Sequence, residues 1–291
     1  MRAVIVLGAV LVAAVAVGAW PGDPDGRIVG GVARHEVQKG DSLRAIGSRF
    51  GVDPATLAFD NGLRLDRPLA VGQLLRVDHR HIVPAGVETG AITVNIPQRL
   101  LFFGEGGRIF HAPVAVGSRG WPTPMTAFTV LVKEVDPTWD VPASIAAEAR
   151  AKGKTLPAKV PPGPANPLGR HWLGLSVGSI GIHGTNAPAS VYQAVTHGCL
   201  RVHPDDVATL FELVLVGTPG RIVYEPVLLA EAYGDIWLEV HPDVYRRIRM
   251  TPAEQVRQAA VDLGLDGRID WEAAARVVAA RHGIARIITL R

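Results

Sequence analysis

The stretch IGIHGTNAPASVYQAVTHGCLRV, residues 180–202, decides how the rest of the chain is interpreted. It contains Cys199, the only cysteine among 291 residues, and two of the ten histidines. A thiol becomes a good nucleophile as a thiolate, and histidine is the side chain that can take up its proton near neutral pH. A lone cysteine can equally be a small buried side chain. The neighbouring Gly198 and Arg201 favour chemistry, because glycine admits close backbone approach and arginine supplies a fixed charge.

Two motifs within this stretch carry a family resemblance. The first is Ile182-His183-Gly184-Thr185, and the second is Thr196-His197-Gly198-Cys199-Leu200-Arg201. With their spacing, they resemble the catalytic domain of the L,D-transpeptidases, cysteine enzymes of the bacterial cell wall. The resemblance covers residues 91–226 and implies a mainly β fold, an L,D-transpeptidase-like β-sandwich. The short strands predicted after Ala91, separated by turns rich in glycine and proline, indicate the same architecture.

The resemblance and the chemistry of the residues together suggest catalytic roles. Cys199 is the predicted nucleophile, and His183 is the predicted base that activates it. The backbone carbonyl of Gly184 would orient the imidazole, in place of the acidic third member of other triads. No metal or organic cofactor is required for this chemistry.

Four further residues complete the predicted site. The backbone N–H groups of Gly198 and Cys199 are expected to donate to an oxyanion, and His197 is expected to shape that hole. Arg201 and Thr196 are the predicted substrate-binding residues. Arg201 could hold a substrate carboxylate through two parallel hydrogen bonds, or brace the loop.

The implied activity is acyl transfer on peptidoglycan. Cys199 would form a thioester with a stem tetrapeptide, releasing D-alanine, and an amine of another stem peptide or of an envelope protein would resolve it. Acylation by carbapenems is expected from the same chemistry. Two alternatives remain open. Water could resolve the thioester, giving an L,D-carboxypeptidase or a crosslink-cleaving hydrolase, or the protein could be a non-catalytic glycan-binding scaffold.

A second resemblance precedes the first, over residues 35–78. Ser42 is a suitable N-cap for one amphipathic helix and Pro54 for the first turn of another, with a strand on either side. The motifs VQKGDSL, NGL and GQLLRV, at 37–43, 61–63 and 72–77, resemble a small βααβ LysM domain. This LysM-like module implies binding to glycan strands of peptidoglycan; a small helical spacer is the alternative.

The N-terminus has the pattern of an export signal. Met1-Arg2 is followed by an apolar run that ends at Trp20-Pro21. Residues 1–21 are therefore predicted to be a signal peptide or a membrane anchor. The protein is expected in the periplasm or cell envelope, with anchoring to the inner membrane as one form of that location.

The remaining segments are interpreted from composition. Residues 78–90 are a linker or the lead-in to the catalytic domain, and the proline-rich segment 137–169 is a long irregular insertion, of the kind that is usually functional or a lid. Residues 228–291 are predicted to be a helical C-terminal tail without a catalytic constellation, with Thr251 and Glu254 forming a capping box at a helix start. A formal net charge of +3 without interleaved basic and aromatic residues does not favour a nucleic-acid partner. A single cysteine excludes an internal disulfide.

Overall fold

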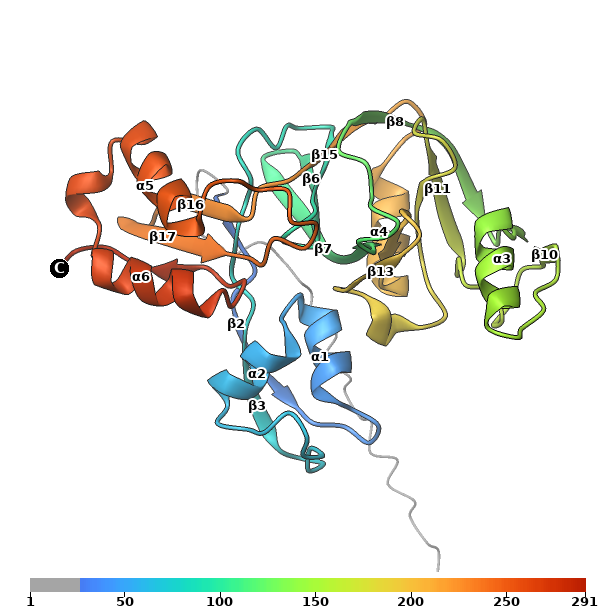
Figure 1. The fold of residues 1–291 in the computed structure, drawn as a ribbon, viewed down its shortest axis with the longest axis horizontal. Helices are drawn as coiled ribbons and strands as arrows, with labels where there is room; N and C mark the ends of the chain where they lie inside the picture. The colour runs from blue at the N-terminus through green and yellow to red at the C-terminus, as the bar shows by residue number, and fades with distance from the viewer. Residues whose placement is uncertain (1–26) are drawn as a thin grey trace, which may run out of the picture.

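The computed structural model describes residues 27–291, which form three parts (Figure 1). The LysM-like module (blue) lies below a large β-rich body (green to gold), and a C-terminal region (orange to red) flanks both. The leader predicted at residues 1–21 lies outside the described residues. Between residues 27 and 291, no helix has the length and apolar character needed to cross a bilayer.

The LysM-like module has the predicted order of strand, helix, helix and strand. Its elements are β2 (Val32–Glu36), α1 (Leu43–Phe50), α2 (Pro54–Asp60) and β3 (Leu74–Asp78), with the two strands antiparallel. The Ser42 hydroxyl caps α1 by accepting a hydrogen bond from the N–H of Ala45 at 3.1 Å. Asp53 caps α2 in the same way, and Gly51 ends α1 in the left-handed region with φ 71.

The core of the LysM-like module is completed by a residue from the far end of the chain. The buried side chains of this core are Val37, Leu43, Ile46, Val52, Leu57, Ala58, Leu75, Val77 and Ile284. Because Ile284 belongs to the C-terminal region, the module and that region share one hydrophobic core.

The segment 78–90 is an ordered lead-in rather than a loose linker. Its strand β4 (His81–Ile82) pairs with β1 (Ile28–Val29). The side chain of His81 is buried, and its Nδ1 lies 2.9 Å from a carboxylate oxygen of Glu239 in the C-terminal region. Glu239 also accepts a hydrogen bond from the N–H of Ile82 at 2.6 Å. The lead-in is therefore fixed to the C-terminal region by buried polar contacts.

The mainly β prediction for the catalytic domain is confirmed. Nine strands form one sheet in the order β13-β7-β14-β12-β11-β8-β15-β5-β6, and β6 also pairs with β7, so that the sheet closes on itself. The strands are β5 (Ile92–Asn95), β6 (Leu100–Glu105), β7 (Arg108–Gly117), β8 (Ala127–Val135), β11 (His171–Leu175), β12 (Gly181–His183), β13 (Ala194–Thr196), β14 (Leu200–Val202) and β15 (Pro219–Val223).

Helix α4 (Pro204–Leu213) and the proline-rich insertion complete this domain. Val207, Leu210 and Val214 of the α4 segment are buried in the same core as the sheet residues. The insertion contains β9 (Trp139–Asp140), α3 (Ala143–Ala151) and β10 (Lys159–Val160). No residue of α3 is fully buried, so this helix rests on the domain surface.

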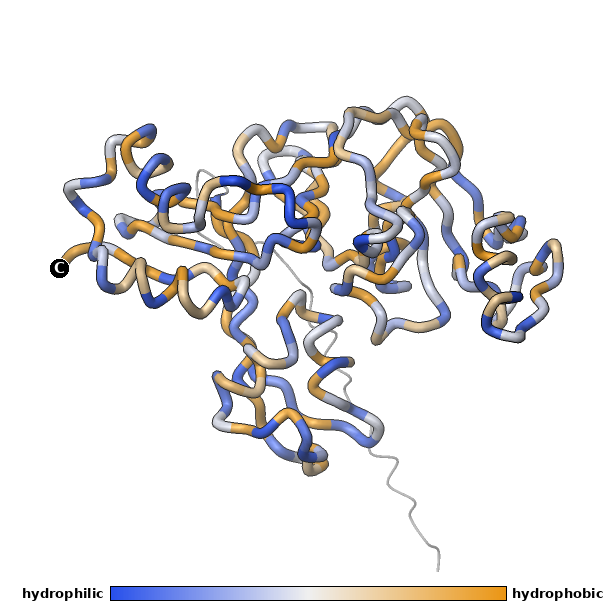
Figure 2. The backbone as a smooth tube through the Cα atoms, in the orientation of Figure 1, coloured by the Kyte–Doolittle hydropathy of each residue, from blue (hydrophilic) through white to orange (hydrophobic). Residues whose placement is uncertain are grey.

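The C-terminal region holds the predicted helices and, in addition, a sheet that the sequence analysis did not identify. Its elements are β16 (Val227–Ala232), β17 (Asp235–Val240), α5 (Pro252–Asp262), η2 (Asp266–Arg268), α6 (Trp271–Ala280) and β18 (Arg286–Ile287), with the strands antiparallel in the order β16-β17-β18. Thr251 and Glu254 form the predicted capping box at the start of α5. Along α5 and α6 the chain alternates between hydrophilic and hydrophobic segments, as expected for helices with one buried face (Figure 2).

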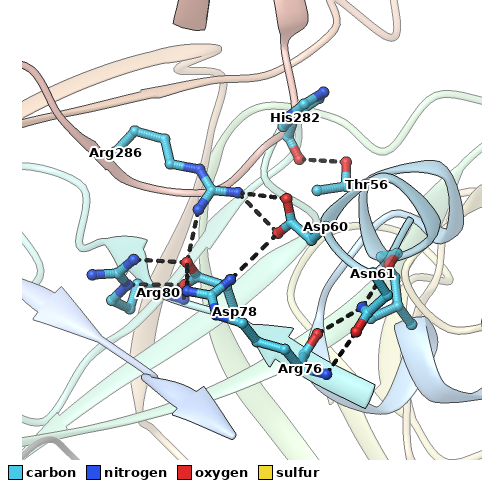
Figure 3. A network of polar contacts seen from close by, with 9 residues as sticks. Thr56, Asp60, Asn61, Arg76, Asp78, Arg80, His282 and Arg286 are labelled. Atoms are coloured by element: carbon cyan, nitrogen blue, oxygen red, sulfur yellow. Dashed lines mark hydrogen bonds and ion pairs between the residues drawn. The ribbon is translucent and has the colours of Figure 1, made fainter. Parts of the chain in front are cut away.

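An ion-pair network joins the LysM-like module to the C-terminal region (Figure 3). Arg286 contacts Asp78 at 2.7 Å and Asp60 at 3.0 Å. The carboxylate of Asp78 is fully buried and also pairs with Arg80 and Arg76. Burial alone would raise the pKa of Asp78, but the surrounding guanidinium groups hold it below its usual value. Asp78 therefore stays ionised, and its buried charge depends on the arginine side chains that pair with it.

Candidate active site

His183 is the last residue of β12, in the middle of the sheet. It pairs with Trp172 on β11 and with Arg201 on β14, and its side chain is buried. Its Nδ1 lies 2.6 Å from the carbonyl oxygen of Gly184. Nδ1 therefore carries the proton, and Nε2 keeps a lone pair. Burial lowers the pKa of His183 to about 4, and the charge of Arg201 acts in the same direction, so the imidazole is neutral at pH 7.

Cys199 directly precedes β14. Leu200, the next residue, pairs in parallel with Ile182 on β12, which brings the two sequence motifs onto neighbouring strands. The thiol is half-buried, with Sγ 3.8 Å from the carbonyl oxygen of Ser179. Burial raises the pKa of the Cys199 thiol, and the charge of Arg201 opposes this only in part. In the resting protein the thiol is therefore protonated at pH 7.

The hydroxyl of Thr196 stabilises the turn that leads to Cys199. The hydroxyl of Thr196 donates to the carbonyl oxygen of Cys199 at 2.6 Å and accepts from the N–H of Gly198 at 3.2 Å. Gly198 has φ 108, a backbone conformation that favours glycine. The Thr196 hydroxyl, predicted to contact substrate, thus stabilises the turn, and the N–H of Gly198, predicted to face an oxyanion, is occupied in this conformation.

The C-terminal region reaches the same turn through Tyr245, which the sequence analysis did not identify. Its hydroxyl donates to the carbonyl oxygen of Gly117 at 2.9 Å and accepts from the N–H of Thr123 at 3.1 Å. The hydroxyl of Thr123 in turn donates to the carbonyl oxygen of Gly198 at 2.9 Å. Tyr245 and Thr123 therefore support the turn that leads to Cys199, which we call the catalytic turn after its predicted role. No local sequence signal marks either residue.

His197 faces the insertion. Its Nε2 lies 2.6 Å from a carboxylate oxygen of Glu148 on α3, and its ring lies 5.2 Å from that of Trp121. Glu148 also forms an ion pair with Lys152, and the hydrogen bond from Lys152, with that from His197, lowers the pKa of Glu148. Since its imidazole is engaged by Glu148, His197 is less suited than His183 to act as the base.

Arg201 brings an uncompensated positive charge to the site. Its Nη1 lies 2.8 Å from the hydroxyl of Ser190, whereas its Nε is buried without a hydrogen-bond partner in the described part of the chain. Within residues 27–291, no carboxylate lies at ion-pair distance from this guanidinium. A partly buried, unpaired guanidinium favours an anionic ligand.

These side chains line a cavity of about 520 Å³. The predicted site residues among its walls are His183, Thr196, His197, Cys199 and Arg201. The insertion supplies further walls, including Trp139, Pro142 and Ile145. Gly184 and Gly198 do not line the cavity; they support the residues that do.

Comparison with known proteins identifies the family. The profile of the L,D-transpeptidase catalytic domain (YkuD) matches residues 89–223, and that of the LysM domain matches residues 35–78. The probable L,D-transpeptidase YcfS of Escherichia coli is 35% identical over 243 residues, 80% of this chain and 75% of that protein. The probable L,D-transpeptidase ErfK/SrfK of Salmonella typhimurium is 34% identical over 236 residues, 78% of this chain and 75% of that protein. The probable L,D-transpeptidase YbiS of Escherichia coli is 37% identical over 174 residues, 58% and 56% of the two chains.

These similarities define the protein as a cell-wall enzyme that carries an additional LysM domain. The chain belongs to the L,D-transpeptidase family.

Proposed function

We propose that this protein is an exported peptidoglycan L,D-transpeptidase that uses Cys199 as its nucleophile. The observation that carries the proposal is one cavity lined by a thiol, a neutral imidazole whose Nδ1 is held by the carbonyl of Gly184, and a guanidinium with a buried, unpaired Nε. Family membership supports the class of reaction. Geometry and general chemistry support the proposed residue roles.

The first half-reaction acylates the enzyme. Nε2 of His183 accepts the proton of the Cys199 thiol as sulfur attacks the carbonyl carbon that follows the L-centre of the diamino acid in a stem tetrapeptide. The tetrahedral intermediate collapses, His183 returns the proton to the departing amine, and D-alanine leaves. The product is a thioester on Cys199. The carbonyl of Gly184 keeps the imidazole in the required tautomer throughout.

The second half-reaction transfers the acyl group. An amine of another stem peptide, or of an envelope protein, attacks the thioester, and its proton passes to His183. The carbon–sulfur bond breaks, and the thiol of Cys199 is regenerated by that proton. The new bond is an amide, so no external energy source or oxidant is needed.

Binding groups complete the mechanism. Arg201 would hold a substrate carboxylate, because its guanidinium has donors left unpaired by the protein. The N–H of Cys199 would donate to the oxyanion, and the N–H of Gly198 would join it when the Thr196 hydroxyl releases it. Each oxyanion donor of this kind contributes about 3 kcal/mol to transition-state stabilisation.

The domain division supports action at the cell wall. We propose a signal peptide or anchor at residues 1–21, a peptidoglycan-binding LysM domain at 35–78, a catalytic domain at 91–226 and a C-terminal region at 228–291. Glycan strands would bind the LysM domain, and their stem peptides would react at Cys199. The periplasm or cell envelope is the corresponding location.

Hydrolysis is the second candidate reaction. Water in place of the acceptor amine would use the same Cys199 and His183 and give a carboxypeptidase or a crosslink-cleaving enzyme. A purely glycan-binding role is less well supported, since a scaffold needs neither the neutral His183 nor the unpaired Arg201.

One experiment distinguishes these functions. The purified protein is incubated with disaccharide-tetrapeptide, and the products are identified by mass spectrometry. A crosslinked dimer with free D-alanine supports transfer, whereas tripeptide alone indicates hydrolysis and unchanged substrate indicates a scaffold.

A carbapenem should add covalently to the wild type and not to Cys199→Ala. An adduct on the alanine variant would contradict the role of Cys199.

A further inference from the structure

The LysM domain touches the catalytic loop directly. Helix α1 packs against η1 (Pro188–Ser190), which lies in the middle of the loop 184–199 that joins the two motifs (Figure 1). Arg44 of α1 lies 3.4 Å from the side-chain oxygen of Gln193 in this loop. Domains joined by a flexible tether would not share such contacts.

The first route from the LysM domain to the site runs through η1. The hydroxyl of Ser190, the last residue of η1, accepts the hydrogen bond from Arg201 at 2.8 Å. The two following residues, Val191 and Tyr192, are buried against Val29, Leu100 and other side chains beneath the loop. The position of η1 therefore fixes one donor of the guanidinium that is proposed to hold substrate.

The second route begins at Arg49, near the end of α1. Its Nη1 lies 2.9 Å from each carboxylate oxygen of Asp206, in the first turn of α4. The Asp206 carboxylate is largely buried, and burial raises its pKa, with the charge of Arg49 acting against this. The ionised carboxylate thus depends on a cation supplied by another domain, 157 residues away in sequence.

Helix α4 connects the Arg49–Asp206 contact to the residues that orient His183. The residue after Asp206 is Val207, which neighbours Gly184: a Cβ on that glycine would lie 3.4 Å from a methyl group of Val207, an ordinary van der Waals contact. The carbonyl of Gly184 fixes the tautomer of His183. A shift of the first turn of α4 would therefore move the group that orients the proposed base.

The opposite side of the LysM domain is also held. Arg286 pairs with Asp60 and Asp78, and the hydroxyl of Thr56 donates to the carbonyl oxygen of His282 at 3.1 Å (Figure 3). Clamped between the C-terminal region and the catalytic domain, α1 has a defined position relative to the cavity.

We propose that α1 of the LysM domain positions the catalytic groups, with Arg49 as the positioning residue that sets α4 and, through Gly184, His183. This inference deepens the proposed function and rests on its assignment of Cys199 and His183. It assigns a LysM domain a part in the chemical step, in addition to holding glycan. Loss of the Arg49 contact therefore lowers turnover and leaves the binding of a soluble tetrapeptide largely intact.

The test compares Arg49→Met and Arg49→Lys with wild type, using the full chain and soluble disaccharide-tetrapeptide. Arg64→Met is the matched control, because it removes an exposed ion pair, Arg64 with Asp66, that is made wholly within the LysM domain. We expect kcat to fall about tenfold in Arg49→Met with KM within about twofold of wild type, because small misplacements of catalytic groups are costly. Arg49→Lys should recover part of the loss, and Arg64→Met should behave as wild type.

A second readout follows the thiol itself. The pH profile of Cys199 alkylation by iodoacetamide should differ between Arg49→Met and wild type, with thermal unfolding used to confirm that both are folded. Equal kcat and equal alkylation profiles in folded Arg49→Met would overturn the proposal. If Arg49→Met does not fold, Arg44→Met removes the weaker contact to Gln193, on the route through η1 to Arg201, and should raise KM about threefold. An unchanged KM in that variant overturns the proposal as well. Alkylation or turnover that persists in Cys199→Ala would instead refute the proposed function.

Discussion

The imidazole of His197 lies 2.6 Å from the carboxylate of Glu148, and this contact joins the catalytic turn to the insertion that lines the cavity. His197 and Glu148 come from two segments that are 49 residues apart in the sequence. The carboxylate of Glu148 is also held by Lys152, the C-cap residue of α3, so it is already oriented to accept a hydrogen bond from His197. The contact therefore connects the insertion, which we propose is a lid, to the catalytic turn. We call this contact the latch.

Replacing Glu148 with alanine should loosen this latch. The KM for the tetrapeptide should rise about threefold, because the pair is partly exposed and such pairs are weak. Acylation by a small carbapenem should change less, since it needs fewer contacts with the lid. Glu134→Ala, a lining carboxylate outside the latch, is the control. A larger effect on carbapenem acylation than on tetrapeptide KM would argue against a latch.

The pH dependence of acylation should report the lowered pKa of His183. A base whose pKa is about 4 stays unprotonated to more acidic pH than an ordinary histidine. The rate of carbapenem acylation should thus be flat from pH 6 to 8 and fall about tenfold per unit below about pH 4. His197→Gln should leave this midpoint in place. A midpoint near the ordinary histidine value would show that another group is the base.

Arg201 should control substrate affinity. Arg201→Met should raise the KM for a tetrapeptide about tenfold or more, because a charge-assisted contact to its carboxylate is lost. Arg201→Lys should recover part of this affinity. Alkylation by uncharged iodoacetamide should change much less. An unchanged KM in Arg201→Met would assign the guanidinium to bracing Ser190 alone.

Tyr245 should link the C-terminal region to catalysis. Tyr245→Phe keeps the ring and removes the hydroxyl that bridges Gly117 and Thr123. Two hydrogen-bonding groups in a buried site lose their partner, so the free energy of unfolding in urea should fall by about 1–3 kcal/mol. Acylation of Cys199 should slow in parallel. Unfolding and acylation that both match wild type would show that the bridge is dispensable.

Stability should decrease in mild acid. Burial lowers the pKa of His111 to about 3 and that of His183 to about 4, whereas both titrate near 6.5 in the unfolded chain. The unfolded state then binds more protons than the folded state between about pH 6.5 and 4, so the free energy of unfolding falls as pH falls through this window. Urea unfolding at pH 7, 6 and 5 measures the slope. His111→Phe should reduce it, and an equal slope would contradict the assignment.

Local sequence patterns predicted the helices and motifs well. Ser42, Pro54 and Thr251 mark helix starts through capping chemistry that involves neighbours only, and each is found where predicted. The two motifs that hold the proposed catalytic residues indicated the family because their residue types and spacing are specific.

Contacts between distant segments could not be predicted in the same way. Arg49 and Asp206 each look like ordinary surface charges in sequence, and only the packing of two domains brings them together. Ile284 likewise gave no sign that it would enter the core of the LysM domain. The sheet of the C-terminal region was missed although alternation in the segment 227–240 could have indicated it. The strong capping signals that follow directed the interpretation toward helices.

The protonated resting state of Cys199 bears on how the enzyme survives outside the cytoplasm, where we propose that it works. Peroxides oxidise the thiolate far faster than the thiol, and sulfinic and sulfonic acids are not reduced back in most settings. The chain has no second cysteine with which a sulfenic acid could condense. A thiol that burial keeps protonated therefore reacts slowly with oxidants until substrate binds and the proposed base, His183, accepts its proton. The raised pKa that delays ionisation is also what protects an irreplaceable sulfur from oxidants between catalytic cycles.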